Sequence, residues 1–231
     1  MTNRILENTF DLKEINITYD SIETKWSKMT PTAVKDEVNK IYSYIRNDPQ
    51  KAINEIKKLN KIYKDIPVLN NFLCSCYEAI GDYENAEKIA IRNYNLFPKY
   101  LFAKTNYAQI CLKNGKTDKI KKIFEGKFDL NSIYPSRKEF HISEFLSFMG
   151  VWSVYYYKIG EEEIARSYHK VMKKVDHSHP LTKSIKQQIY PPLLIRILAK
   201  ILGKERIKLI KNEIAEKKSA QNADRDRDGH H

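Results

Sequence analysis

The stretch PVLNNFLCSCYEAIGDYENAEKIAIRNYNLFP, residues 67–98, decides the fold of this chain. It contains two helical patterns that meet at Gly81, and each has apolar residues recurring three and four positions apart. The same turn position recurs at Asn47 and Gly115, each 34 residues from Gly81, and Gly160 repeats the pattern after an extra eleven residues. A fixed interval of this size is typical of arrays of stacked helical hairpins.

Working outward from that stretch, we predict an all-α fold. We expect a right-handed α-α superhelix of about four hairpins over residues 30–178, closed by capping helices over residues 179–218. The predicted hairpin helices begin near Thr30, Pro49, Pro67, Asp82, Leu101, Thr117, Arg137 and Glu161.

Three parts of the chain depart from the repeat. Residues 125–140 form an irregular insertion, at the end of which Ser136 and Glu139 make a capping box that predicts a helix start near Arg137. Residues 1–29 show no clear period, and we expect an arm that packs on the first hairpin. Residues 219–231 are expected to be a disordered tail that includes tag sequence.

The composition is that of a globular chain with a basic surface. Of the 231 residues, 42% are hydrophobic and 30% charged, and the net charge of +12 favours acidic partners. Three cysteines do not make a disulfide framework, the N-terminus has no signal-peptide pattern, and no apolar run is long enough to span a membrane. We therefore expect a cytoplasmic protein.

At Gly81 the residue types resemble a tetratricopeptide repeat. The matching positions are Cys74, Tyr77, Gly81, Tyr83, Ala86 and Pro98, followed in later units by Ala108, Gly115, Phe124, Trp152, Ser153, Tyr156, Gly160 and Ala165. The chain departs from the pattern at Ile120, where alanine is usual, and at Lys40, where a small residue is expected. The resemblance covers residues 33–178. It implies a non-enzymatic scaffold or adaptor that binds a peptide or protein segment.

The resemblance also implies where the partner would bind, because first helices line the groove in this family. The groove residues that it implies here are Asn71, Ser75, Phe102, Asn106, Gln109, Lys113 and Tyr157, with Val68, Glu78, Thr105, Gly150, Val151 and Val154 beside them. Amide side chains can hydrogen-bond a peptide backbone whatever its sequence, and Lys113 could meet a carboxylate. The alternative for each residue is an ordinary solvated position on a helix.

Other clusters favour packing over chemistry. We expect Cys74, Cys76 and Cys111 to be core residues, His177 and His179 to lie on the surface, and neither set to hold a metal or cofactor. No phosphate-binding loop or nucleophile motif supports an enzyme. A dense aromatic set surrounds Trp152, in which Trp152 and Tyr156 should face inward. Tyr155 or Tyr157 either projects into the groove or completes a packed junction.

Residues 192–218 combine an apolar stripe with lysines and arginine, and they leave three interpretations open. They cap the array, they lie on an anionic membrane surface, or they hold a partner helix. The alternative to a scaffold is therefore a peripheral binder of anionic membrane or nucleic acid. Nucleic acid is the less favoured of these, because the basic residues are scattered and no RNA-binding aromatic motif occurs.

Overall fold

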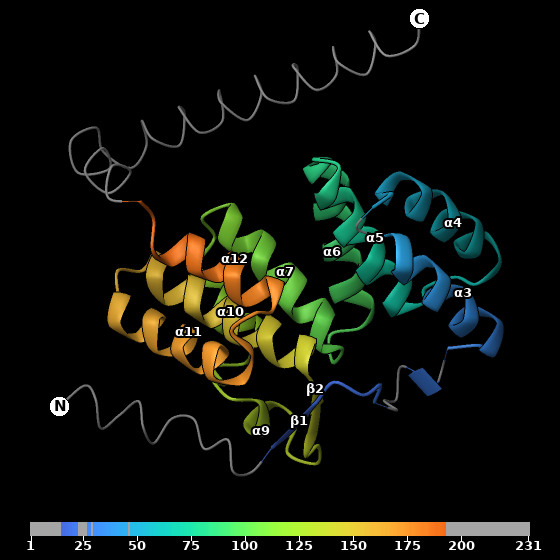
Figure 1. Ribbon diagram of the computed structural model, residues 1–231. Helices are drawn as coiled ribbons and strands as arrows, with labels where there is room; N and C mark the ends of the chain where they lie inside the picture. The colour runs from blue at the N-terminus through green and yellow to red at the C-terminus, as the bar shows by residue number, and fades with distance from the viewer. Residues whose placement is uncertain (1–14, 23–26, 29, 46, 193–231) are drawn as a thin grey trace, which may run out of the picture. The chain divides into compact units, whose positions relative to one another are not determined.

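The protein is built from helices that pack against their neighbours in sequence (Figure 1). The computed structural model describes residues 15–22, 27–28, 30–45 and 47–192. The chain divides into two units, Met1–Ile189 and Tyr190–His231, and all the helices and strands described here belong to the first.

The elements follow one another in this order: β1 (Asn16–Thr18), α3 (Thr32–Tyr44), α4 (Pro49–Ile62), α5 (Pro67–Ala79), α6 (Tyr83–Leu96), α7 (Leu101–Lys113), α8 (Asp118–Ile123), α9 (Leu130–Ile133), β2 (Glu139–His141), α10 (Ile142–Lys158), α11 (Glu162–Asp176) and α12 (Pro180–Ile189). The prediction of an all-α fold is confirmed. Helices α3 and α4, α5 and α6, α7 and α8, and α10 and α11 pack as pairs, and α7 also contacts α5 and α10. The superhelical arrangement of these pairs stays a prediction.

Glycine closes the first helix of three pairs. Gly81, Gly115 and Gly160 have φ angles of 79°, 73° and 92°, a left-handed conformation that other residues adopt at a cost. At the first of these turns the N–H of Asp82 donates to the carbonyl of Tyr77 at 2.9 Å, and an equivalent bond spans the other two turns. The repeated glycine therefore sets a repeated turn geometry.

A small residue holds the two helices of a pair together at two equivalent places. The Cys74 thiol donates to the Ala86 carbonyl at 3.6 Å, and the Ser153 hydroxyl donates to the Ala165 carbonyl at 2.8 Å. Both contacts join residues twelve positions apart. The small side chain thus allows the close helix approach that the sequence pattern predicts.

The buried apolar side chains form two clusters. The N-terminal cluster extends from Val34 to Ile110, and the C-terminal cluster extends from Leu101 to Ile189. Helix α7 contributes to both, since Ile110 belongs to the first and Ala108 to the second. The helix pairs on either side are therefore joined through α7.

The described part of the N-terminal arm lies elsewhere than expected. Strand β1 pairs in parallel with β2, with Ile17 opposite Phe140, and so reaches past the first hairpin to the insertion. The Tyr19 hydroxyl donates to the Asp176 carboxylate, at the end of α11, at 2.8 Å. The physical reason is that Ile15 and Ile17 pack against the C-terminal cluster. The prediction that the arm packs on the first hairpin is wrong for these residues.

Helix α10 also begins later than predicted. It starts at Ile142 instead of near Arg137, because residues 139–141 are extended and pair with β1. The capping box is made by His141 and Glu144, whose carboxylate accepts from the backbone N–H of His141 at 3.2 Å. The prediction based on Ser136 and Glu139 is therefore wrong.

Helix α12 is the described part of the predicted C-terminal cap, and it packs on α10 and α11. The predicted helices after Pro192 and the tail at 219–231 lie outside the described residues, as do residues 1–14 of the arm. Among the described residues, no helix has the length and apolar character needed to cross a membrane.

Candidate functional site

The predicted groove residues of α5 and α7 lie on one side of each helix, because they are spaced three and four positions apart. We call this surface the α5–α7 face. It consists of Asn71, Ser75 and Glu78 from α5 and of Phe102, Asn106, Gln109 and Lys113 from α7.

An amide pair joins the two helices at the centre of the face. The Asn106 side-chain amide donates to the Asn71 side-chain carbonyl at 2.6 Å, and both side chains are half-buried. The exposed Ser75 hydroxyl donates to the backbone carbonyl of Asn71 at 3.2 Å. The structure therefore brings together three of the predicted site residues.

An ion pair joins α5 and α7 toward the C-terminal ends of both helices. Lys113 and Glu78 are in direct contact, and the Lys113 ammonium lies 5.6 Å from the ring centroid of Tyr83. Glu78 is 27% exposed and Lys113 is 51% exposed. The lysine that the sequence assigns to a partner's carboxylate thus already has a carboxylate within the chain, in a pair that is only weakly stabilising at this exposure.

Two other members of the face are half-buried and lie nearby on α7. The Gln109 side chain makes no hydrogen bond within the described part of the chain, so its amide has both donor and acceptor capacity left. The Phe102 ring packs edge-on against Tyr100, with 5.8 Å between centroids. The face therefore combines polar groups with one apolar contact surface.

Tyr157 does not join this group as an exposed anchor. It is half-buried and packs against the C-terminal cluster, while Tyr155 is only 5% exposed. Trp152 is fully buried and Tyr156 is half-buried, as predicted for inward-facing residues. Of the two alternatives that the sequence leaves open for Tyr155 and Tyr157, the structure therefore favours the packed junction.

The predicted groove positions on α10 are buried as well. Val151 and Val154 are 1% and 7% exposed, and a Cβ atom on Gly150 would lie 3.1 Å from the Ile185 side chain of α12. Helix α12 covers this part of α10, so Gly150 is a packing residue. Thr105 on α7 is also fully buried. Gly150 itself is a signal that could have indicated this packing, because a glycine inside a helix costs about 1 kcal/mol relative to alanine.

Two charged groups that sequence reasoning missed are structural. The buried Lys104 ammonium donates to the Ile123 carbonyl at the end of α8, at 2.7 Å, and to the Glu125 carboxylate at 3.2 Å. The hydrogen bond and positive charge of Lys104 lower the pKa of Glu125. Arg137 pairs with the buried carboxylate of Glu144 at the start of α10. Both cations hold the ends of helices beside the insertion.

The three cysteines are buried and free, and they are poorly suited to act as nucleophiles or metal ligands. Burial raises the pKa of the Cys74 thiol to about 12 and that of Cys76 to about 11, and burial also raises the pKa of Cys111. Within the described ranges, no group of three histidine, cysteine, aspartate or glutamate side chains is arranged to hold a metal ion.

We expect a thiol reagent such as Ellman's to label none of the three cysteines in the folded protein at neutral pH, and all three in urea. The thiolate is the reactive form, and burial disfavours it at each site. The absorbance of the released thionitrobenzoate measures the labelling. Rapid labelling of one thiol in native buffer would show that its surroundings open.

Comparison with protein-family models, curated proteins and solved structures finds no significant match. The resemblance to tetratricopeptide repeats therefore stays a prediction that rests on the residues quoted above.

Proposed function

We propose that the protein is a non-catalytic binding module that holds an extended peptide segment of a partner protein against the α5–α7 face. The amide pair of Asn71 and Asn106 is the observation that carries this proposal. Each side-chain amide has two donor hydrogens and a carbonyl acceptor, and one hydrogen bond between the two leaves most of that capacity for a ligand.

The chemistry of the face matches a peptide backbone. An extended peptide presents N–H and C=O groups in alternation, and the amides of Asn71, Asn106 and Gln109 can satisfy both kinds. Phe102 of α7 and Val68 of α5 are half-buried and could contact the apolar side chains of the peptide. Such recognition depends little on the sequence of the peptide.

The charge of the face separates this proposal from the alternative. Glu78 and Lys113 neutralise each other, so the α5–α7 face carries no net charge. Binding there should depend only weakly on ionic strength, whereas binding driven by the net charge of +12 should weaken strongly with salt. The alternative, a peripheral binder of anionic membrane or nucleic acid, stays a prediction because it rests mainly on residues 193–218, outside the described residues.

Replacing Asn106 and Gln109 together with alanine should weaken capture of the partner. Each amide would lose about one ligand hydrogen bond, so the expected loss is about 2 kcal/mol, or roughly thirtyfold in affinity. Capture from lysate with quantification of the co-purifying species measures the effect first, followed by the dissociation constant of the partner that is identified.

The matched control replaces Gln187 and Gln188 with alanine. These two amides are exposed on α12, a helix that contributes no residue to the α5–α7 face, and their loss should leave capture unchanged. Circular dichroism should show the same helical content in both double variants. If the Asn106 and Gln109 variant keeps its helices and captures the partner as well as the parent protein does, the proposed face is wrong.

A further inference from the structure

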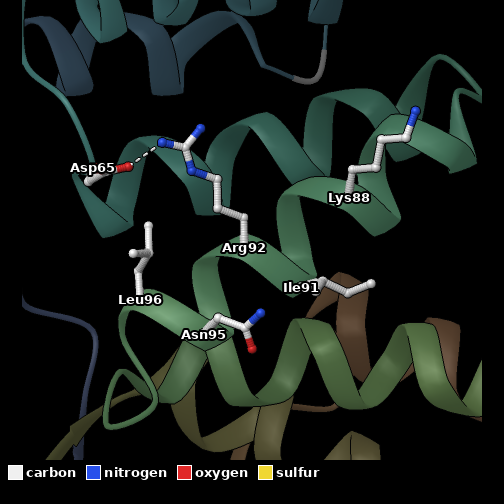
Figure 2. Close-up of a pocket in the computed structure, with 6 residues that line it drawn as sticks. All are labelled: Asp65, Lys88, Ile91, Arg92, Asn95 and Leu96. Atoms are coloured by element: carbon white, nitrogen blue, oxygen red, sulfur yellow. Dashed lines mark hydrogen bonds and ion pairs between the residues drawn. The ribbon is translucent and has the colours of Figure 1, made fainter.

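A depression of about 460 Å³ lies on α6, beside the connection between α4 and α5 (Figure 2). It is lined by Asp65 of the connection and by Lys88, Ile91, Arg92, Asn95 and Leu96 of α6. Its volume lies within the range of about 300–1,000 Å³ that is usual for ligand pockets.

The depression lies on the side of α6 that faces away from its packing partners. Ala86, Ala90 and Asn93 are buried where α6 packs on α5 and α7. At about 100° per residue, Lys88 and Arg92 point to the opposite side of the helix. The depression is therefore separate from the α5–α7 face, to which α6 contributes no residue.

Its floor is apolar. Ile91 is half-buried and Leu96 is 45% exposed, and the two border the same hollow (Figure 2). A single exposed leucine is common on protein surfaces. Two aliphatic side chains in one hollow offer a place for a large apolar side chain of a partner.

Its rim is basic. The Arg92 guanidinium donates to the Asp65 carboxylate at 2.5 Å, and the Lys88 ammonium pairs with Glu84 at 2.6 Å on the solvent side. All four side chains are at least 40% exposed, so these ion pairs are weak and a ligand carboxylate can replace them. Two cations and one carboxylate line the hollow itself.

We propose that this depression binds a short acidic segment of a partner protein. A large apolar side chain of that segment packs on Ile91 and Leu96, and carboxylates on either side of it pair with Lys88 and Arg92. Charge complementarity and the apolar floor together favour this ligand. A nucleic acid has no large apolar side chain and would leave the floor unused.

The test measures the dissociation constant of a fluorescein-labelled peptide, Asp-Glu-Leu-Phe-Glu-Asp, by fluorescence anisotropy at low and moderate salt. Arg92→Glu should weaken binding by at least about tenfold, because it replaces an attraction with a repulsion. Leu96→Ser should weaken it by about tenfold through loss of apolar contact. Asp65→Asn should strengthen it, because it removes the carboxylate that competes for Arg92.

Three controls decide what a loss of binding means. Lys170→Glu makes the same change in net charge on the exposed surface of α11 and should leave binding unchanged. Every measurement is made in the background of Asn106→Ala and Gln109→Ala, which weakens binding of the same peptide to the α5–α7 face, so that the remaining binding reports on the depression. A peptide with Ser-Ser in place of Leu-Phe should bind at least about tenfold more weakly.

The proposal is overturned if the labelled peptide does not bind, or if Arg92→Glu and Lys170→Glu have equal effects. It is also overturned if the serine peptide binds as well as the parent peptide, since charge alone would then explain the affinity. Phosphatidylserine vesicles or single-stranded oligothymidylate that compete for the site at an equal concentration of negative charge would assign it to a membrane or a nucleic acid instead.

Discussion

Replacing Arg137 with alanine should lower the free energy of unfolding by about 3 kcal/mol, because the buried carboxylate of Glu144 then loses its partner. The guanidinium donates to one Glu144 oxygen at 3.0 Å and contacts the other directly, which makes a two-point pair. Glu144 is 6% exposed, but Arg137 is 23% exposed. This partial exposure places the expected cost at the lower end of the usual range of about 3–5 kcal/mol.

Arg137 also orders the residues before α10. Its Nε donates to the backbone carbonyl of Glu139 at 2.8 Å, and its guanidinium lies 4.3 Å from the ring centroid of Phe140. These contacts fix β2, against which β1 of the N-terminal arm pairs. The variant should therefore loosen the strand pair as well as the start of the helix.

Urea unfolding followed by circular dichroism measures the loss, and a double-mutant cycle with Glu144→Gln identifies its source. In the Glu144→Gln background, Arg137→Ala should cost much less, because a neutral amide tolerates the missing cation better than a carboxylate does. Arg137→Lys should fall between the parent and the alanine variant, since lysine keeps the charge but not the two-point geometry. Equal costs in both backgrounds would show that the ion pair is not the cause.

The parts of the fold that the sequence predicts well are those set by local chemistry. Gly81, Gly115 and Gly160 end helices in the left-handed conformation, and Pro49 and Pro67 begin them, so the helix ends follow from residues close in the chain. The small residues two turns before the helix ends also pack as expected. The repeat interval then indicates which helices form a pair.

The insertion and the arm were predicted poorly because their structure depends on distant residues. Strand β1 pairs with residues 123 positions away, for example Asn16 with Glu139. No sequence pattern near β1 identifies β2 as its pairing strand. Two capping boxes compete near the start of α10, one at Ser136 and one at His141. Burial of Glu144 and strand pairing at β2 select the second, and neither can be read from spacing alone.

The candidate site likewise has features that the sequence predicts and features that it does not. Asn71 and Asn106 are 35 positions apart, close to one repeat interval, and they do meet between neighbouring first helices. The equivalent region of α10 is closed by α12 at Gly150, which the family pattern alone does not predict. The depression on α6 was missed because it depends on Asp65, which lies in the connection between α4 and α5, where the sequence has no repeat signal.

Replacing Trp152 with alanine should lower the free energy of unfolding by about 4 kcal/mol. The side chain is fully buried, and its ring lies 4.7 Å from that of Phe128 and 5.5 Å from that of Phe124, measured between centroids. Phe124 and Phe128 belong to the end of α8 and the insertion, whereas Trp152 belongs to α10. The alanine variant would leave a large cavity where these segments meet, and packed cores relax only partly around such cavities.

Trp152→Phe is the matched control, and its cost should be no more than about half as large. Phenylalanine keeps a ring in the cluster, and it also removes the indole N–H, which has no hydrogen-bond partner within the described residues. Urea unfolding followed by circular dichroism gives both values. Hydrogen exchange should rise more in α10 than in α5 for the alanine variant, because the two helices belong to different core clusters joined through α7. A uniform rise in exchange would instead show that the clusters unfold as one unit, and a loss below about 1 kcal/mol would show that the ring is not a main support of the C-terminal cluster.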